Sequence, residues 1–211
     1  LGPDYTDSYI EKNIIPSLKN IKYIKANFYK NFNDLTQIVC KKIINEGVVG
    51  WFQDRMEWGP RALGNRSILG DPRNSNMRDI INFKIKKREE FRPFAPSVLF
   101  EFANDYFFMN NEDSAYMCSV YDAKKENKSK IPSVVHVDGT SRVQTVKETI
   151  NPKFYRLIKN FYDLTGVPIL LNTSLNVNEP ICENPENAFE IFSKTSMDML
   201  VIQNWVFTKN E

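Results

Sequence analysis

The segment GPRALGNRSILGDPR, residues 59–73, places three arginines among three glycines and two prolines. Glycines allow backbone shapes and close approaches that other residues resist. The guanidinium groups of Arg61, Arg66 and Arg73 offer forked donors that match phosphate or carboxylate oxygens, and Glu57 is placed just upstream to orient one of them. The segment predicts an anion-binding loop. On this stretch alone, an arginine-rich turn paired with neighbouring acids is the alternative.

Two further segments carry arginines in apolar surroundings. Arg92 lies between Phe91 and the apolar letters PFAPSVL, and Arg142 enters the predicted strand RVQTV. A guanidinium in such surroundings needs either a protein acid or a bound anion as its partner. By contrast, Lys84 and Lys87 fit the solvated face of a helix, which is the usual place for a run of charges.

Amides and hydroxyls follow the short apolar segment VPILL in the sequence: Asn172, Thr173, Ser174 and Asn176. The end of such a strand is where ligands of open α/β sheets bind, although these residue types also form turns and helix caps. The segments together predict an anion pocket with small polar residues beside four arginines: Arg61, Arg66, Arg92 and Arg142.

The sequence contains one histidine and three cysteines, which limits metal chemistry. His136 lies in the predicted strand SVVHV, where a lone histidine is more often a core or hydrogen-bonding residue than a catalyst. A histidine-rich metal centre is therefore excluded within these residues. Cys40, Cys118 and Cys182 are too widely spaced for a disulfide framework or a zinc site, so we expect buried thiols in a reducing compartment.

The overall charge excludes other partner classes. The 211 residues contain 28 Lys and Arg against 26 Asp and Glu, a net charge of +2, so any anion site must be local. An extended nucleic-acid surface normally needs a basic stripe and is disfavoured. No apolar segment reaches the roughly 18 residues of a membrane span, and the first residues resemble neither a signal peptide nor a transit peptide. We expect a cytoplasmic chain with no membrane partner, and the missing initiator Met indicates a processed or excised product.

Apolar periodicity and turn residues predict alternating helices and strands, hence an α/β domain with a mixed sheet. Helices are expected at 8–15, from a cap at Asp34 to Gly47, from Asn74 or Ser75 to Ile85, after Asn151 and after Asn184. Strands are expected at 23–29, 48–52, 95–100, 116–121, 133–137, 142–146, 167–171 and 199–207. Asp138 and Gly139 predict a hairpin turn, and the polar segment 122–130 predicts a surface loop.

Four blocks of the sequence resemble, in order, the signature blocks of the C-terminal domain of NodU-type O-carbamoyltransferases: EWGPRALGNRSILGDPR, MRDIINFKIKKREEFRPFAPSVL, HVDGTSRVQTV and TGVPILLNTSLNV. The resemblance runs from about residue 50 to the C-terminus. It implies a YrdC-like α/β fold over residues 34–211, with a twisted mixed sheet, flanking helices and a concave basic pocket. Residues 1–33 would then form the segment that joins an N-terminal ATPase-like transfer domain.

The resemblance also implies a reaction. The domain would bind carbamoyl phosphate and ATP with Mg²⁺ and form carbamoyladenylate. The N-terminal domain, which carries an iron-type metal, would pass the carbamoyl group to a sugar or alcohol hydroxyl. Carried onto this sequence, the catalytic residues would be Arg61, Lys86, Arg92 and Arg142. The substrate- and nucleotide-binding residues would be Arg66, His136, Asn172, Thr173, Ser174 and Asn176, and no metal ligand is implied.

Two features depart from the family pattern. The segment NVNEPI, which begins at Asn176, is one residue shorter than usual and lacks the usual glycine. The metal-bearing transfer domain is not among the 211 residues, so complete carbamoylation of an acceptor is not expected of them alone. A YrdC-like module that binds double-stranded RNA or a protein without chemistry is the alternative. The identity of the acceptor and the formation of a homodimer are left open.

Overall fold

The computed structural model describes residues 2–87 and 94–210. Its helices are α1 (Asp7–Asn13), α2 (Phe32–Ile44), α3 (Met77–Ile81), α4 (Ala103–Tyr106), α5 (Pro152–Thr165) and α6 (Pro185–Lys194). Its strands are β1 (Ile24–Phe28), β2 (Val49–Phe52), β3 (Arg66–Gly70), β4 (Ala95–Leu99), β5 (Tyr121–Asp122), β6 (Thr140–Ser141), β7 (Gln144–Val146), β8 (Ile169–Ser174), β9 (Met199–Ile202) and β10 (Trp205–Lys209). Short 3₁₀ segments follow α1 and precede α4, and a π-helical segment, Asn82–Lys86, continues α3.

Within the described ranges, the strands form an eight-stranded mixed sheet in the order β1-β10-β9-β2-β3-β8-β4-β7, and β5 pairs with β6 separately. The pairs β2–β9 and β4–β7 are parallel and the remaining pairs are antiparallel. The central strands β2, β3 and β4 are buried at every position, as expected of strands covered on both faces. The predicted α/β class with a mixed sheet is confirmed.

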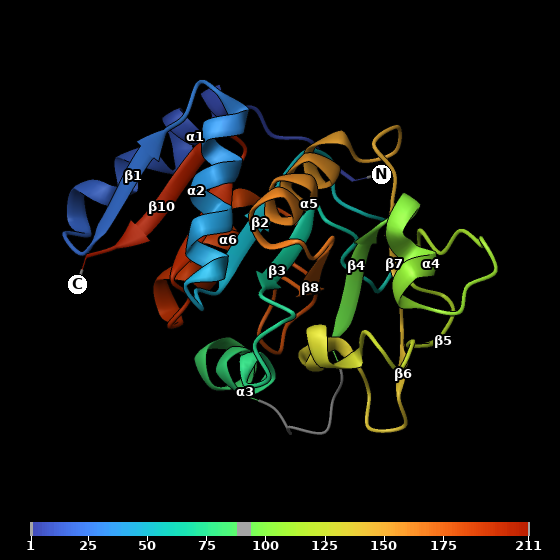
Figure 1. Cartoon of the computed structure of the whole chain (residues 1–211). Coiled ribbons are helices and arrows are strands. Elements are labelled where there is room, and N and C mark those ends of the chain that lie inside the picture. The colour runs from blue at the N-terminus through green and yellow to red at the C-terminus, as the bar shows by residue number, and fades with distance from the viewer. Residues whose placement is uncertain (1, 88–93, 211) are drawn as a thin grey trace.

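Helices cover both faces of the sheet. Trp51 of β2 packs against Phe32 of α2, with ring centroids 6.2 Å apart. The adjacent Gly50 shares the other face with Phe207 of β10, whose ring packs against Phe189 of α6 at 5.5 Å. Because successive strand residues point to opposite faces, α2 and α6 lie on opposite sides. Figure 1 shows α2 and α5 side by side in front of the sheet, where the two helices are in contact.

The cap residues that were predicted for α5 and α6 are present. Asn151 accepts a hydrogen bond from the Phe154 amide at 3.1 Å, and Asn184 accepts one from the Asn187 amide at 2.8 Å. Gly166 ends α5 with φ of 72°, a left-handed conformation that glycine adopts without steric cost. These signals are local in sequence, which is why periodicity and capping rules identified both helices.

Helix α2 begins earlier than predicted. Its cap is Asn31, whose side chain accepts a hydrogen bond from the Asn33 amide, and Asp34 lies inside the first turn. Residues 24–28 form the edge strand β1, which pairs with β10, and Ile10 and Ile24 belong to the same hydrophobic core as the rest of the domain. The division at residues 33 and 34 stays a prediction about where two family domains join.

Three predicted strands are wrong. Residues 199–207 form β9 and the start of β10, because the chain reverses at Gln203, which has φ of 51°. Residues 132–134 form a 3₁₀ turn, and of 116–121 only Tyr121 joins a strand. Arg142 lies in the two-residue link between β6 and β7, outside either strand. Short apolar runs do not distinguish strands from buried irregular segments.

Within the described ranges, no helix combines the length and apolar character that crossing a membrane requires.

The close approach of Gly64 to α5 gives a stability prediction. Gly64 has φ of 105°, and a Cβ there would lie 2.2 Å from Cδ1 of the buried Phe154. We expect Gly64→Ala to lower the free energy of unfolding by about 3 kcal/mol, since it adds overpacking to backbone strain. Urea denaturation measures the loss. Gly59→Ala is the matched control, because Gly59 has φ of 108° and open space around it. Equal losses in both variants would contradict a role for the Phe154 contact.

Candidate anion-binding site

A small cavity of about 90 Å³ lies where β8 ends and β4 begins. Its lining residues come from the loop before β3, the start of β4, the segment between α4 and β5, the link between β6 and β7, and the end of β8: Pro60, Arg61, Ala62, Phe94, Ala95, Met117, Arg142, Asn172, Thr173 and Ser174. The cavity brings together residues predicted from separate segments of the sequence: Arg61, Arg142, Asn172, Thr173 and Ser174.

The two arginines of this cavity have no acidic partner. Among the described residues, neither Arg61 nor Arg142 forms an ion pair or a side-chain hydrogen bond, and the buried Nε of Arg142 has no acceptor. Burial, and then the charge of Arg61, lower the pKa of Arg142. Among the described residues, no carboxylate lines the cavity. Two like charges that lie together without a counterion favour the binding of an anion between them.

Asn172 is held at the cavity by a buried polar network. Its Nδ2 lies within hydrogen-bond distance of the carbonyl oxygen of Ala62, Oγ of Ser97 and Oε1 of Gln144 at 3.0–3.2 Å. Nε2 of Gln144 donates to the carbonyl of Leu63. This hydrogen bond connects the network to residues 59–73, which we call the arginine loop. These contacts fix the plane of the Asn172 amide. Its buried Oδ1 has no hydrogen-bond partner in the described part of the chain.

Lys86 anchors the end of β8 from the π-helical segment. It is 2% exposed, and its Nζ contacts the carbonyl oxygens of Ser174 and Asn176 at 2.6 and 2.9 Å and Oδ1 of Asn176 at 2.6 Å. Ser174 Oγ also donates to Asn176 Oδ1. Ser174 lines the cavity. Lys86 and Asn176 do not line it, but both contact Ser174 directly. The catalytic role predicted for Lys86 stays a prediction.

The shortened segment after Asn176 closes into a tight turn. Asn176 Nδ2 donates to the carbonyl of Glu179, and the Glu179 carboxylate accepts the amides of Val177 and Asn178 at 3.0 and 3.1 Å. Partial burial acts to raise the pKa of Glu179, but these amide hydrogen bonds outweigh it and lower the pKa. The turn has its own closing contacts without the extra residue and glycine that the family pattern would supply.

Arg66 lies in the core, and the ligand-binding role predicted for it stays a prediction. Its side chain is fully buried and stacks on the Phe52 ring, with 3.5 Å between Cζ and the centroid. Its two terminal nitrogens donate to the carbonyls of Gln53, Asn65 and Asp54 at 2.7–3.1 Å. The guanidinium therefore closes the turn that precedes the arginine loop, and Arg66 does not line the cavity.

Glu57 and Asp71 accept hydrogen bonds from other residues of the arginine loop. Oε1 of Glu57 accepts the amides of Leu63, Asn65 and Arg66 at 2.7–3.1 Å. Glu57 therefore orients the backbone of the loop, whereas the sequence suggested that it orients an arginine. Arg73 forms a forked ion pair with Asp71, whose closest contact is 2.6 Å. The alternative of pairing with a neighbouring acid is correct for Arg73.

The remaining predicted residues have other settings. His136 is half-buried, its Nδ1 lies 3.1 Å from Oγ1 of Thr140, and it does not line the cavity. Arg92 lies outside the described residues. Cys40 and Cys182 are buried as predicted, whereas Cys118 is exposed because segment 116–121 is mostly irregular.

A second cavity, of about 470 Å³, adjoins the first. The two share Pro60, Arg61, Met117 and Arg142. The second is also lined by Trp58, Leu63, Tyr116 and Cys118. Sequence reasoning missed Trp58 and Tyr116. The only signal for them in the sequence was that Trp58 directly precedes the GPRALG block.

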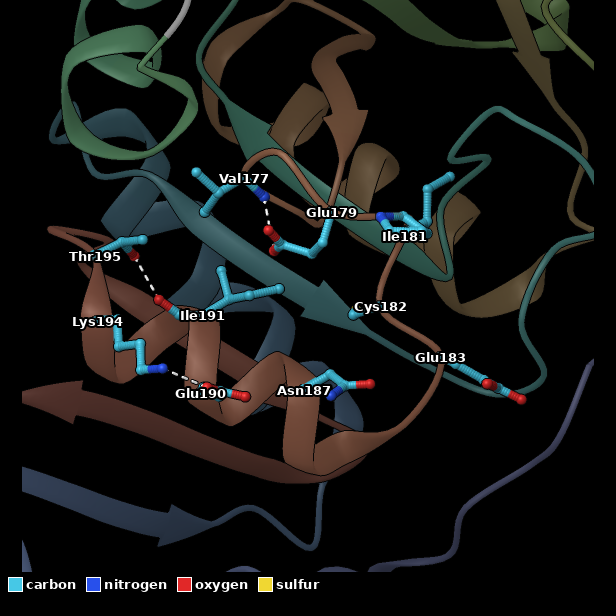
Figure 2. A pocket seen from close by; sticks show the side chains of 11 residues that line it. Val177, Glu179, Ile181, Cys182, Glu183, Asn187, Glu190, Ile191, Lys194 and Thr195 are labelled. Atoms are coloured by element: carbon cyan, nitrogen blue, oxygen red, sulfur yellow. Dashed lines mark hydrogen bonds and ion pairs between the residues drawn. The ribbon is translucent and has the colours of Figure 1, made fainter.

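A third cavity of the described part of the chain, of about 520 Å³, is larger than both and lies between the turn after Asn176 and helix α6 (Figure 2). Figure 2 shows Glu190 paired with Lys194, and Glu179 bonded to the amide of Val177. The lining residues of this cavity, so far as the structure describes the chain, include no arginine. Size alone therefore does not identify the anion site. Within residues 2–87 and 94–210, no group of three or more His, Cys, Asp or Glu side chains is arranged to hold a metal ion.

Residues 40–209 match the Carbamoyltransferase C-terminus family. The chain belongs to this family. It is 43% identical to an uncharacterized protein of Synechocystis, over 99% of this chain and 37% of that protein. It is 41% identical to the nodulation protein NolNO of Sinorhizobium fredii, over 99% of this chain and 30% of that protein.

A 3'-hydroxymethylcephem-O-carbamoyltransferase of Amycolatopsis lactamdurans is 41% identical over 75% of this chain and 30% of that enzyme. The chain thus spans about a third of the length of these relatives. Among solved structures, full-length HypF in its phosphate- and nucleotide-bound form aligns with 89% of this chain and 22% of HypF. The TM-score is 0.52 and the identity 18%. This likeness confirms the predicted YrdC-like fold.

Proposed function

We propose that the chain is the C-terminal domain of an O-carbamoyltransferase and that it joins carbamoyl phosphate and MgATP into carbamoyladenylate. The observation that carries the proposal is the pair of arginines, Arg61 and Arg142, at one cavity without an acidic partner in the described part of the chain. Membership of the Carbamoyltransferase C-terminus family supports the carbamoyl group as the unit handled.

The charges of the two substrates explain why the cavity needs fixed arginines. Carbamoyl phosphate is a dianion and the triphosphate of ATP carries up to four negative charges, so the two repel each other strongly in a site with little water. Arg61 and Arg142 neutralise part of this charge and orient the phosphate oxygens. The ammonium group of Lys86, just behind Ser174, adds positive charge near the end of β8.

The proposed chemistry requires no side-chain nucleophile. Water first displaces phosphate from carbamoyl phosphate, which gives carbamate and inorganic phosphate. A carbamate oxygen then attacks the α-phosphorus of ATP, the bond between that phosphorus and the bridging oxygen breaks, and pyrophosphate leaves. The chain contributes positioning and electrostatic stabilisation. Magnesium enters as MgATP, held by phosphate oxygens.

Asn172 is the residue proposed to contact the carbamoyl group. Its Oδ1 is a buried acceptor with no partner among the described residues. An unsatisfied buried acceptor costs free energy, and a ligand that donates a hydrogen bond to it removes that cost. The NH₂ of carbamate supplies such a donor. Transfer from carbamoyladenylate to a sugar or alcohol hydroxyl then falls to an N-terminal ATPase-like domain.

Pyrophosphate release tests this function. We expect the 211-residue chain to release pyrophosphate from MgATP only when carbamoyl phosphate is added, and to produce no carbamoylated sugar. A coupled pyrophosphate assay, with carbamoyl phosphate omitted as the control, measures it. Calorimetry on the same sample reports binding of carbamoyl phosphate. Absence of both pyrophosphate release and carbamoyl phosphate binding would contradict the proposal, and salt-dependent binding of duplex RNA in their place would support the alternative binding module.

A further inference from the structure

The anion cavity is too small to enclose a nucleotide. Its volume of about 90 Å³ lies well below the roughly 300–1,000 Å³ of pockets that bury whole small-molecule ligands. The adjoining cavity adds about 470 Å³ and shares Arg61 and Arg142 with the first. A ligand whose phosphates contact the two arginines can therefore extend into the second cavity without leaving them.

Two exposed aromatic side chains line this second cavity. Trp58 is 87% exposed and Tyr116 is 68% exposed. Both also line another cavity, of about 350 Å³, so each ring borders two cavities. Neither ring contacts another aromatic ring or a cation in the described part of the chain. Large rings left in water gain free energy when a flat apolar face covers them.

We propose that Trp58 and Tyr116 bind the base of the nucleotide by stacking and set a preference for purine over pyrimidine nucleotides. The inference rests on the proposed function. A nucleotide has an anionic end for Arg61 and Arg142 and a flat ring a sugar's length away. Purines offer the larger face to a pair of aromatic side chains, and stacking of a base on an aromatic residue depends on that face more than on hydrogen bonds.

Ligands with and without a base test the proposal. We expect Trp58→Ala and Tyr116→Ala each to weaken ATP binding by about 10-fold in calorimetry, while tripolyphosphate and carbamoyl phosphate bind as in the parent chain. Trp58→Phe should retain most of the ATP affinity, and the ratio of ATP to UTP affinity should fall in Trp58→Ala. Phe108→Ala is the matched control, because Phe108 is 61% exposed and does not line the three cavities of the site.

Cys118 provides a second readout that loss of structure would not imitate. It is exposed and lines the same cavity as Trp58, whereas burial raises the pKa of Cys40 and of Cys182 to about 12. Iodoacetamide at pH 8 should therefore modify Cys118 selectively, since the thiolate is the reactive form. We expect ATP to slow this modification and tripolyphosphate to leave it unchanged.

The outcomes separate the two proposals. If the parent chain binds ATP but the aromatic variants weaken ATP and tripolyphosphate equally, or weaken neither, the base-binding inference is overturned and the proposed function stands. Unchanged alkylation of Cys118 in saturating ATP would overturn it as well. If the parent chain binds neither ATP nor carbamoyl phosphate, the proposed function fails and the inference fails with it.

Discussion

Replacement of Arg142 by methionine should remove most of the affinity for carbamoyl phosphate and leave the fold intact. Arg142 lines the anion cavity, its buried Nε has no acceptor, and it has no acidic partner among the described residues. Loss of a desolvated charged partner costs about 2–5 kcal/mol of binding free energy, and methionine preserves the apolar stem. Calorimetry with carbamoyl phosphate measures the loss.

The stability of Arg142→Met should match that of the parent chain or slightly exceed it. Burial and the charge of Arg61 both act against the charged form of Arg142, which is why its pKa is lowered. Arg156→Met is the control variant, because Arg156 is exposed on α5 and lines none of the cavities. Carbamoyl phosphate affinity that is equal in both variants would show that Arg142 does not bind the phosphate.

Replacement of Arg66 by methionine should lower stability and leave carbamoyl phosphate affinity nearly unchanged, which is the reverse of the effect expected for Arg142→Met. The change removes three hydrogen bonds from a charged donor and leaves the carbonyls of Gln53, Asp54 and Asn65 without it. We expect the free energy of unfolding to fall by about 3 kcal/mol or more, since hydrogen bonds to charged groups and unsatisfied buried carbonyls both contribute. Urea denaturation measures the fall.

Arg66→Lys tests whether the planar set of donors or the positive charge of Arg66 stabilises the fold. Lysine keeps the charge but loses the planar donor geometry and the stacking on Phe52, so it should rescue little of the lost stability. Carbamoyl phosphate affinity of the folded fraction should stay near that of the parent chain. A loss of stability below about 1 kcal/mol in Arg66→Met would contradict the structural role assigned to this residue.

Local signals in the sequence predicted the helices well. The pairs Asn151–Pro152 and Asn184–Pro185 each fix a helix start through a side-chain hydrogen bond within three residues. The reversal at Gln203 and Asn204 was missed because the apolar segments 199–202 and 205–207 on either side of this pair continue the pattern of a strand. The turn depends on distant contacts, such as the Gln203 side chain donating to the carbonyl of Tyr5.

The candidate site was only partly predictable for a related reason. Residue type together with a glycine-rich or apolar setting predicted anion-binding roles for Arg61, Arg66 and Arg142 alike. What separates them is whether backbone carbonyls surround the guanidinium, and for Arg66 two of the three carbonyls come from a turn more than ten residues upstream. Trp58 and Tyr116 lie 58 positions apart, so no local pattern shows that they line one cavity.

The position of bound phosphate tests the central claim most directly. We expect a crystal structure with carbamoyl phosphate and a non-hydrolysable ATP analogue to show phosphate oxygens within hydrogen-bond distance of the Arg61 and Arg142 guanidinium groups, with the carbamoyl group at Asn172. The cavity beside α6 should hold neither ligand. Density for both ligands in that cavity, with Arg61 and Arg142 making no contact to phosphate, would contradict the account.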